Sequence, residues 1–484
     1  MFTPYFPALR SRLAALGRRT AQTLRQATLS QIQEHLRNVL PPPVLSATDE
    51  GPNSRDRVFN VRFTFECFVW QLLTPDTSCR EVVRHVQALL RLLGRAVIDK
   101  GDSAYVQARQ RLPRERLEKA LELTAQAADR RVGSGGQLQG RPVKVVDGSS
   151  TQLADTRPNQ KAYPQHGTQK PGCGFPLMKF VVLFSLCSGT VLNVMMGNVH
   201  AHDLRLLRGL WDCLRKGDIL LGDRAYGEYT TLATLPRQGV DVVARLHHAR
   251  KVDFRKARRL AKNDGLFVWR KGWPQSRILS AREWALLPTE ITVRIVRFTA
   301  AIRGFRSRRI TLVTTLLDAE LYSAEELVAL YARRWRLELC LRDLKTTMGM
   351  EELRCKTPQM AEKELLTYLV AHNLLRCVIA EAVALYQVDL ERVSFKGSVD
   401  ALRQYSDAIG KARNQGMRRQ LWEDLLLNLA RDLVRHRPNR REPRAVKRRP
   451  KPYPLLNQPR HQFVEISHRS RYWKGRPRNY RELN

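Results

Sequence analysis

SAEELVALYARRWRLELCLRDLKTTMGM, residues 323–350, is the stretch on which the fold and the function of the chain depend. Ser323 is followed three residues later by Glu326, a capping box that predicts the start of a helix. No Pro or Gly interrupts the stretch before Gly349, so the helix is expected to continue that far. At about 100° per residue, five apolar side chains share one narrow arc that must be buried: Leu330, Leu337, Leu341, Leu344 and Met348.

A second arc of this helix lies roughly 90° away from the first. It collects Tyr331, Arg334, Trp335, Glu338, Arg342 and Lys345. Most charged stripes are solvated faces, and this one could be too. A solvated face has little use for Tyr and Trp, however, and one carboxylate among several cations fits a metal ligand beside a row of phosphate-binding side chains. The helix by itself leaves the two explanations equally open.

The chain carries a large excess of positive charge. Its 84 Lys and Arg against 46 Asp and Glu give a formal net charge of +38. Such an excess attracts polyanions over long distances, so nucleic acid is the leading partner. A ribosome-associated or merely basic protein is the alternative, but 484 residues allow two or three domains with a large core. The longest apolar run, residues 180–186, is far too short to span a bilayer.

The cysteine spacing and the absence of a nucleotide-binding loop restrict further which class of protein this can be. The eight Cys include no Cys-x-x-Cys pair, which favours a reduced, intracellular protein with no zinc module. The chain has no Gly-x-x-x-x-Gly-Lys-Ser/Thr loop, which argues against an ATP-driven machine.

The two ends of the chain are expected to be helical and basic. Residues 1–132 predict a helical N-terminal region for DNA binding or docking, although simple packing explains the pattern equally well, and the Arg-rich start also fits a transit peptide. A second capping box, Ser78 with Glu81, begins one of its helices. Residues 360–435 return to helix. Residues 436–484 form a basic tail that is either solvated or in contact with phosphates, and its aromatic pair could stack on bases: Tyr472 and Trp473.

Between residues 140 and 359 the pattern indicates an α/β catalytic domain. Runs rich in Val, Leu and Phe predict strands, and a helix-like stretch, residues 203–215, separates the third strand from the fourth. An inserted β-rich stretch, residues 247–318, follows the fifth strand and contains two further strand-like runs, at 291–298 and 310–316. The five core strands are expected at residues 143–146, 179–187, 190–196, 219–221 and 241–246.

Three acids stand where such a domain can bring them together. Asp147 is expected to end the first strand, Asp223 follows the fourth, and Glu338 is on the long helix. Either Asp alone is more often a turn former, but three converging carboxylates repel one another unless cations are present. Two Mg²⁺ ions, or Mn²⁺, about 3.5–4 Å apart would relieve that repulsion and could activate a water or a DNA 3′-hydroxyl.

Two other groups of residues are weaker candidates. His200 and His202 with Asp203 have the composition of a zinc site, but their spacing on a predicted loop makes a site improbable. Ser149 and Ser150 have no nearby base with which to build a triad, so they are expected to form turns and hydrogen bonds.

The spacing Y-x2-R-x3-E-x6-K of Tyr331, Arg334, Glu338 and Lys345 resembles the signature of the IS-four family of bacterial insertion-sequence DDE transposases. Asp-Gly-Ser at 147–149 and Gly-Asp-Arg at 222–224 are similar to the family's blocks around its first and second acids. The resemblance covers roughly residues 60 to 460 and includes the basic run 444–460. The chain departs from some relatives at Ala225-Tyr226, where they carry Glu-Ala-Asp.

The resemblance implies a ribonuclease-H-like α/β core with a β-rich insertion, in which Asp147, Asp223 and Glu338 hold two Mg²⁺ ions. It implies that transposon-end DNA is contacted by the remaining signature residues and their neighbours: Tyr331, Arg334, Trp335, Lys345 and Arg224. The implied activity is cleavage at the element's ends followed by 3′-hydroxyl strand transfer into target DNA, carried out by a homodimer in the bacterial cytoplasm, at the nucleoid. A nuclease that cuts without joining and a domesticated DNA-binding protein are the alternatives.

Overall fold

The computed structural model describes residues 39–46, 58–74, 76–92, 94, 96–133, 135–170, 172–272, 278–300 and 308–434, with a few residues near the C-terminus (462, 464–465 and 478–479). The sequence predictions for residues 1–38, for Tyr472 and Trp473, and for the basic run 444–460 lie outside the described residues.

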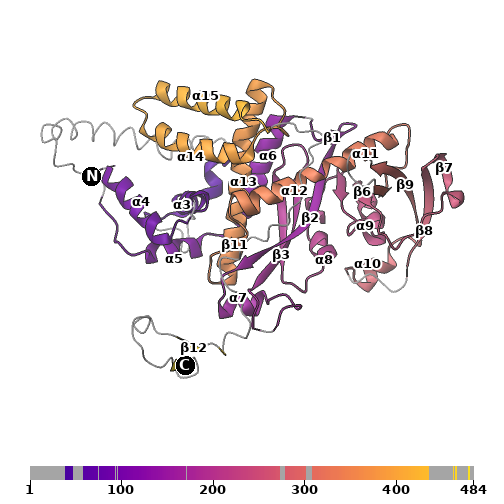
Figure 1. Ribbon diagram of the computed structural model, residues 1–484, viewed down its shortest axis with the longest axis horizontal. Helices are drawn as coiled ribbons and strands as arrows, with labels where there is room; N and C mark the ends of the chain where they lie inside the picture. The colour runs from indigo at the N-terminus through magenta and orange to yellow at the C-terminus, as the bar shows by residue number, and fades with distance from the viewer. Residues whose placement is uncertain are drawn as a thin grey trace, which may run out of the picture.

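One large mixed sheet forms the centre of the protein (Figure 1). Strand β2 lies between β3, which is antiparallel to it, and β5, which is parallel to it. The order β4-β3-β2-β5-β6, with β6 parallel to β5, fits a ribonuclease-H-like core. These five strands span Arg141–Leu153 (β2), Leu177–Ser185 (β3), Val191–Gly197 (β4), Ile219–Gly222 (β5) and Asp241–Arg245 (β6). Two short strands flank β2: β1 (Gln137–Leu138) and β11 (Glu352–Leu353).

Both faces of the centre of this sheet are buried, because β3 and β5 carry runs of consecutive apolar residues, at 180–184 and 219–221. Val145 and Phe180 belong to a core shared with the long C-terminal helices, whereas Val146 and Val181 belong to a second core on the opposite face. The second core is covered by short helices: α8 (Asp203–Arg208), η2 (Trp211–Cys213), α9 (Tyr229–Thr234) and η3 (Leu235–Gln238). The predicted helix at 203–215 is therefore two short pieces, α8 and η2.

The sheet continues into the stretch inserted between β6 and the long helix, because β10 pairs with β6. The two predicted strands are present as β9 (Glu290–Ala300) and β10 (Arg308–Thr314). Two strands not predicted from the sequence, β8 (Asp264–Arg270) and the exposed edge strand β7 (Arg258–Ala261), extend the sheet further, at the right of Figure 1. The short helices of this stretch are η4 (Phe254–Lys256) and α10 (Ala281–Ala285).

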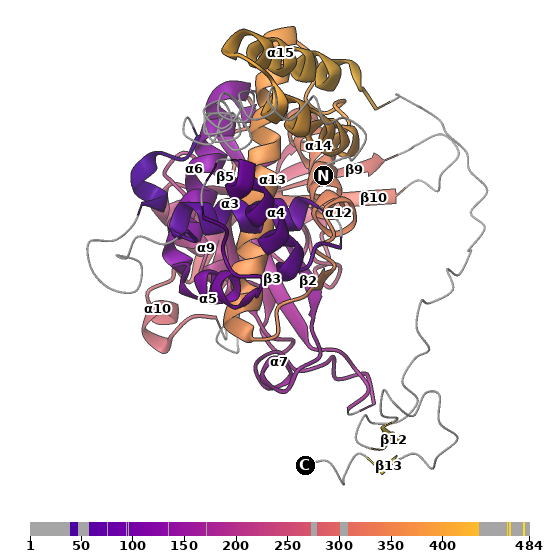
Figure 2. The same ribbon diagram turned by 90° about the vertical axis from the view of Figure 1, so that its left-hand side faces the viewer.

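The predicted helices before and after the sheet are present, and they pack together. The N-terminal ones are α3 (Val61–Leu73), α4 (Cys79–Leu92), α5 (Ser103–Arg111) and α6 (Arg114–Val132). The C-terminal ones are α13 (Pro358–Tyr386), α14 (Phe395–Lys411) and α15 (Gln415–Arg431). Helix α13 lies beside α6 in both views (Figures 1 and 2). The remaining elements are η1 (Pro42–Leu45), α7 (Arg157–Ala162), α11 (Ala324–Arg333), α12 (Trp335–Arg342), η5 (Asp343–Thr347), β12 (Val464–Glu465) and β13 (Arg478–Asn479).

Asn373, on α13, joins three of these parts. Its fully buried amide donates to the carbonyl oxygens of Leu121 on α6 and Val191 on β4, and its oxygen accepts from the Val191 N–H. Helix α13 is long and apolar enough to cross a membrane, but 72% of its most apolar window is buried inside the protein. Its hydrophobicity is therefore explained by its place in the core.

Candidate active site

The long helix begins as predicted. Ser323 Oγ accepts the Glu326 N–H at 3.2 Å, and the Glu326 carboxylate accepts the Ser323 N–H at 2.9 Å, so the capping box is confirmed. The apolar stripe is buried, with exposures from 0% at Leu344 to 8% at Leu341.

The helix is not continuous, in contrast to the prediction. Helix α11 ends at Arg333 and α12 begins at Trp335. At this junction the Arg334 N–H bonds to the Tyr331 carbonyl and the Leu337 N–H bonds to the Arg334 carbonyl, each a tighter i→i+3 link. The last turn, η5, widens into a π-helix. Such departures from α geometry are frequent at functional sites, and sequence periodicity does not detect them.

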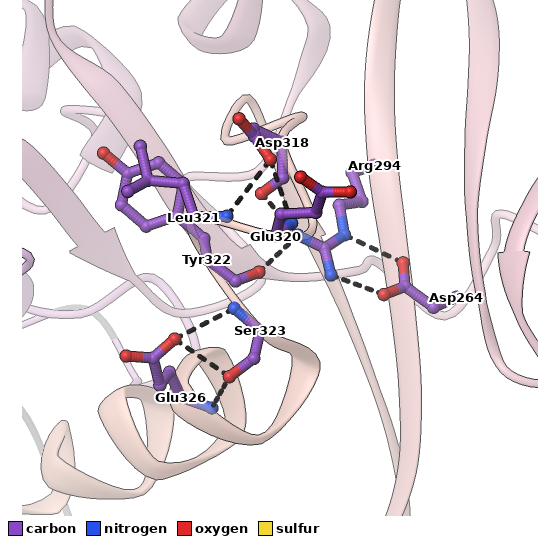
Figure 3. A network of polar contacts seen from close by, with 8 residues as sticks. All are labelled: Asp264, Arg294, Asp318, Glu320, Leu321, Tyr322, Ser323 and Glu326. Atoms are coloured by element: carbon purple, nitrogen blue, oxygen red, sulfur yellow. Dashed lines mark hydrogen bonds and ion pairs between the residues drawn. The ribbon is translucent and has the colours of Figure 1, made fainter.

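A buried ion pair holds the chain that leads into α11 (Figure 3). Arg294, on β9, is fully buried and forms a bidentate salt bridge with Asp264 on β8, in which Arg294 Nε lies 2.9 Å from Asp264 Oδ1. Its third nitrogen donates to the Tyr322 carbonyl at 2.6 Å and to the Asp318 carbonyl at 3.2 Å. The inserted strands thus fix the segment directly before the Ser323 cap.

Asp147 and Asp223 are brought together by the register of two parallel strands. Val145 of β2 pairs with Leu221 of β5, so the residues two positions further on come level with each other. Asp223 follows β5, as predicted. Asp147 does not end its strand: β2 continues to Leu153, because its pairing with β3 extends beyond the point where β5 stops. The prediction that Asp147 ends a strand is therefore wrong, although its position beside Asp223 does not depend on it.

The electrostatics of Asp147 show that Glu338 belongs to the same cluster. The pKa of Asp147 is raised to about 6, chiefly by burial, with further contributions from the charges of Asp223 and Glu338. The Gly148 N–H, 2.9 Å from Asp147 Oδ1, and the Arg334 guanidinium act in the opposite direction. The charges of Asp223 and Glu338, both remote from Asp147 along the chain, therefore disfavour the ionisation of Asp147.

Arg334 is the counter-ion in this environment. Its Nη2 lies 2.6 Å from Glu338 Oε1, and its Nη1 lies 3.8 Å from Asp147 Oδ2. Among the described residues, no three His, Cys, Asp or Glu side chains are arranged so that they could hold a metal ion. The oxygen donors suit a hard divalent cation, and their mutual repulsion is what such a cation relieves.

The other signature residues are placed unequally. Trp335 is 60% exposed, which core packing does not explain, and Arg342 is also exposed. Lys345 and Arg224 are half-buried. Tyr331 does not lie on the open face: it is 9% exposed and packs under Arg334, whose guanidinium carbon is 5.8 Å from the ring centroid. An angular position on a helix could not predict this, because the neighbouring strands cover that part of the face.

The weaker sequence candidates take structural positions. His202 caps α8, with its Nδ1 accepting the Leu204 N–H. Ser149 and Ser150 pair with β3 inside the sheet. All eight cysteines are free thiols.

Two polar residues beside the acids were not singled out from the sequence as members of this site. Tyr226, three residues after Asp223, interacts electrostatically with both aspartates. Asp203, at the start of α8, pairs with Lys179 of β3 at 2.7 Å. The one available signal was Tyr226's place in the stretch Ala225-Tyr226, where the chain departs from some relatives.

The chain is similar to known transposases over the region that holds the three acids. Residues 138–374, which contain all three acids, match the family described as "Transposase DDE domain". The transposase InsG for insertion sequence element IS4 of Escherichia coli (strain K12) is 28% identical, over 81% of this chain and 87% of the relative. A cryo-EM structure of the piggyBac transposase synaptic complex with hairpin DNA covers 85% of each chain at 11% identity and a TM-score of 0.41, which is too low for any conclusion.

Proposed function

Since this chain is a DDE transposase of the IS-four family, a DNA-binding enzyme that acts on an insertion sequence, we propose that Asp147, Asp223 and Glu338 are its catalytic acids. Two observations support the proposal: Asp223 and Glu338 both act on the pKa of Asp147, and Arg334 pairs with Glu338 and Asp147. DDE transposases use divalent metal ions, and we propose two Mg²⁺ ions here, with Mn²⁺ as a substitute.

The three carboxylates would hold these ions and set the geometry of phosphodiester cleavage. When bound, such ions would lower the pKa of the attacking water or 3′-hydroxyl and neutralise the negative charge that develops on the leaving oxygen. In the first step a water oxygen bonds to the scissile phosphorus and the 3′-oxygen leaves with a proton. In the second step that 3′-hydroxyl attacks a phosphorus of the target strand, whose own 3′-oxygen leaves. The number of phosphodiester bonds is unchanged in strand transfer, so no nucleotide cofactor is needed.

Arg334 would exchange partners when DNA and metal bind. In the described structure it neutralises Glu338 and Asp147. Once a cation takes over that role, the guanidinium is free to bind a backbone phosphate beside the cut, in the forked geometry that arginine offers. Lys345, Arg224 and the exposed Trp335 would extend the same contact, with Trp335 packing around a displaced base.

The assembly and the location follow from this chemistry. Cutting two ends and joining both to one target requires two active sites, so we propose a homodimer on paired transposon ends, with target DNA bound afterwards. A net charge of +38 supports strong attraction to DNA. We place the protein in the bacterial cytoplasm, at the nucleoid when bound. The domain division 1–132, 140–359 and 360–435, with a basic tail from 436, belongs to the same proposal.

Glu338→Gln tests the acids directly. The amide keeps the size of the side chain but cannot supply a metal-binding charge, so Mg²⁺-dependent cleavage of transposon-end DNA should disappear while end binding is retained. Glu325→Gln, on an exposed residue of α11, makes the same change outside the site and should cleave normally. Residual Mg²⁺-dependent cutting by Glu338→Gln would show that the acid is misassigned.

Strand transfer separates a transposase reaction from simple nucleolysis. Pre-cleaved end DNA incubated with a target plasmid should give joined products with the unaltered protein and none with Glu338→Gln. Cut ends without any joined product would favour a nuclease that cuts but does not join.

A further inference from the structure

Tyr226 is folded back toward the catalytic acids by its own turn. It follows β5 by four residues, and its N–H bonds to the Asp223 carbonyl at 3.3 Å. Its ring packs on Gly222, where an added Cβ would lie only 2.8 Å from the Tyr226 Cβ. A glycine at the end of β5 therefore leaves the space that the ring fills, and the side chain as a whole is 2% exposed.

The hydroxyl of Tyr226 faces the backbone beside Asp147. A Cβ built on Gly148, the residue after Asp147, would lie 3.5 Å from this hydroxyl and 3.4 Å from Asp203 Oδ2. Asp203 already has a cationic partner, because Lys179 Nζ is 2.7 Å from its other oxygen. Within the part of the chain that the structure describes, the Tyr226 hydroxyl has no hydrogen bond of its own, although it sits among three carboxylates.

Tyr226 is almost fully buried, but its hydroxyl oxygen is not among the sealed polar atoms without a partner in the described residues. A hydroxyl that has no other partner gains most from an ionised acceptor. A tyrosine keeps its proton far above neutral pH, so here it can only act as a donor toward a carboxylate. Asp147 directly precedes Gly148, the residue that this hydroxyl faces, and Arg334 contacts Asp147 only at 3.8 Å.

We propose that Tyr226 is a positioning residue for cleavage: its hydroxyl, which has no partner in the described structure, turns to donate a hydrogen bond to the Asp147 carboxylate and holds it in the orientation that the reaction requires. The inference rests on the proposed role of Asp147. A hydrogen bond to one carboxylate oxygen leaves the other directed at the reacting phosphate and its cations, as outer hydrogen bonds commonly do at metal sites.

Tyr226→Phe removes only this hydroxyl. Single-turnover cleavage of transposon-end DNA should fall about tenfold, the effect expected of one hydrogen bond to a charged group, while end binding is unchanged. The apparent affinity of the DNA-free protein for Mn²⁺, followed by electron paramagnetic resonance, should weaken severalfold. Tyr229→Phe is the matched control: its hydroxyl donates to the Pro288 carbonyl at 2.8 Å, away from the acids, and both measurements should stay at the level of the unaltered protein.

Three outcomes would overturn the inference. The first is Tyr226→Phe cleaving DNA and binding Mn²⁺ as the unaltered protein does. The second is a loss in Tyr226→Phe that is matched by an equal loss of thermal stability and is shared by Tyr229→Phe, because the hydroxyl would then be purely structural. The third is that Tyr226→Phe has no further effect in an Asp203→Asn background, because the hydroxyl would then act on Asp203. Cleavage by Glu338→Gln, by contrast, would overturn the proposed acids and not this inference alone.

Discussion

Arg334 shows how a single residue can serve two states of the same site. Burial raises the pKa of Asp147, and repulsion from the charges of Asp223 and Glu338 raises it further. Arg334 offsets that repulsion by contacting Glu338 and Asp147. The same side chain is one of the proposed phosphate contacts. In the proposed mechanism this cation would leave the acids for a DNA phosphate, which would account for both its partial burial and its place in the signature.

His372 supplies a residue-scale prediction about pH and stability. Burial, and then the charge of Arg376, lower the pKa of His372 to about 3 from an ordinary value of 6.5. Between these values the unfolded chain binds a proton that the folded protein does not, so the free energy of unfolding falls as the pH drops below about 6.5. Relative to a non-titrating variant, the loss between pH 7 and pH 5 should be about 2 kcal/mol.

His372→Phe is the suitable variant, because Phe184 and Phe395 already surround the ring. Urea unfolding of both proteins at pH 7 and pH 5 gives the difference, in which all other titrating groups cancel. Equal pH dependence of the two proteins would contradict the prediction.

At the scale of elements, the break between α11 and α12 and the π turn of η5 determine which side chains of the signature face the acids. Arg334 lies at the break itself, Glu338 one turn later and Lys345 on η5. Their position relative to β2 and β5 depends on where α11 begins. That point is held by Arg294 of β9, through the carbonyls of Asp318 and Tyr322.

Arg294→Met should therefore be among the most destabilising single changes outside the site. It leaves the Asp264 carboxylate buried without its partner, at a cost of about 3–5 kcal/mol in the free energy of unfolding. Arg270→Met is the matched control: it breaks an arginine–glutamate pair in the same sheet, but one in which the arginine is 85% exposed, so the loss should be below about 1 kcal/mol. Urea unfolding compares the two, and similar losses would refute the argument.

A double change separates charge from packing at this element. Asp264→Leu with Arg294→Met removes both charges and keeps the volume apolar, so it should recover much of the stability lost in Arg294→Met alone. If the double variant is as unstable as the single one, the carbonyl contacts to the segment before α11 contribute more than the ion pair.

The molecule as a whole combines a main core, to which both ends of the chain contribute, with a large excess of positive charge. Helices α6 and α13 and the sheet pack together, with Asn373 linking all three, so the signature helix rests on a scaffold drawn from both ends of the chain. Around this scaffold the net charge of +38 provides a sequence-independent attraction to DNA. Binding should accordingly weaken steeply with added salt, whatever the sequence of the DNA.

Lys345→Ala tests whether one particular cation of the signature contributes to DNA binding beyond the attraction due to the net charge of the whole protein. Removing one phosphate contact should weaken end binding and reduce the slope of log affinity against log salt by about one unit. Lys119→Ala, which removes an equal charge from the far helix α6 and breaks only an exposed pair with Glu122, should leave the slope almost unchanged. Equal slopes for all three proteins, measured by titration between low and moderate salt, would exclude a contact at Lys345.

By itself, the sequence determined the local features: the capping boxes at Ser323 and Ser78, the buried stripe of the signature helix and the five core strands. Such features depend on neighbouring residues, so periodicity and spacing reveal them. The tertiary structure alone decided that β2 continues past Asp147, that Tyr331 is covered, that Arg334 bridges two acids and that Tyr226 faces Gly148. Each of these depends on which distant segment packs against the residue, and strand register and helix packing are properties of the whole fold.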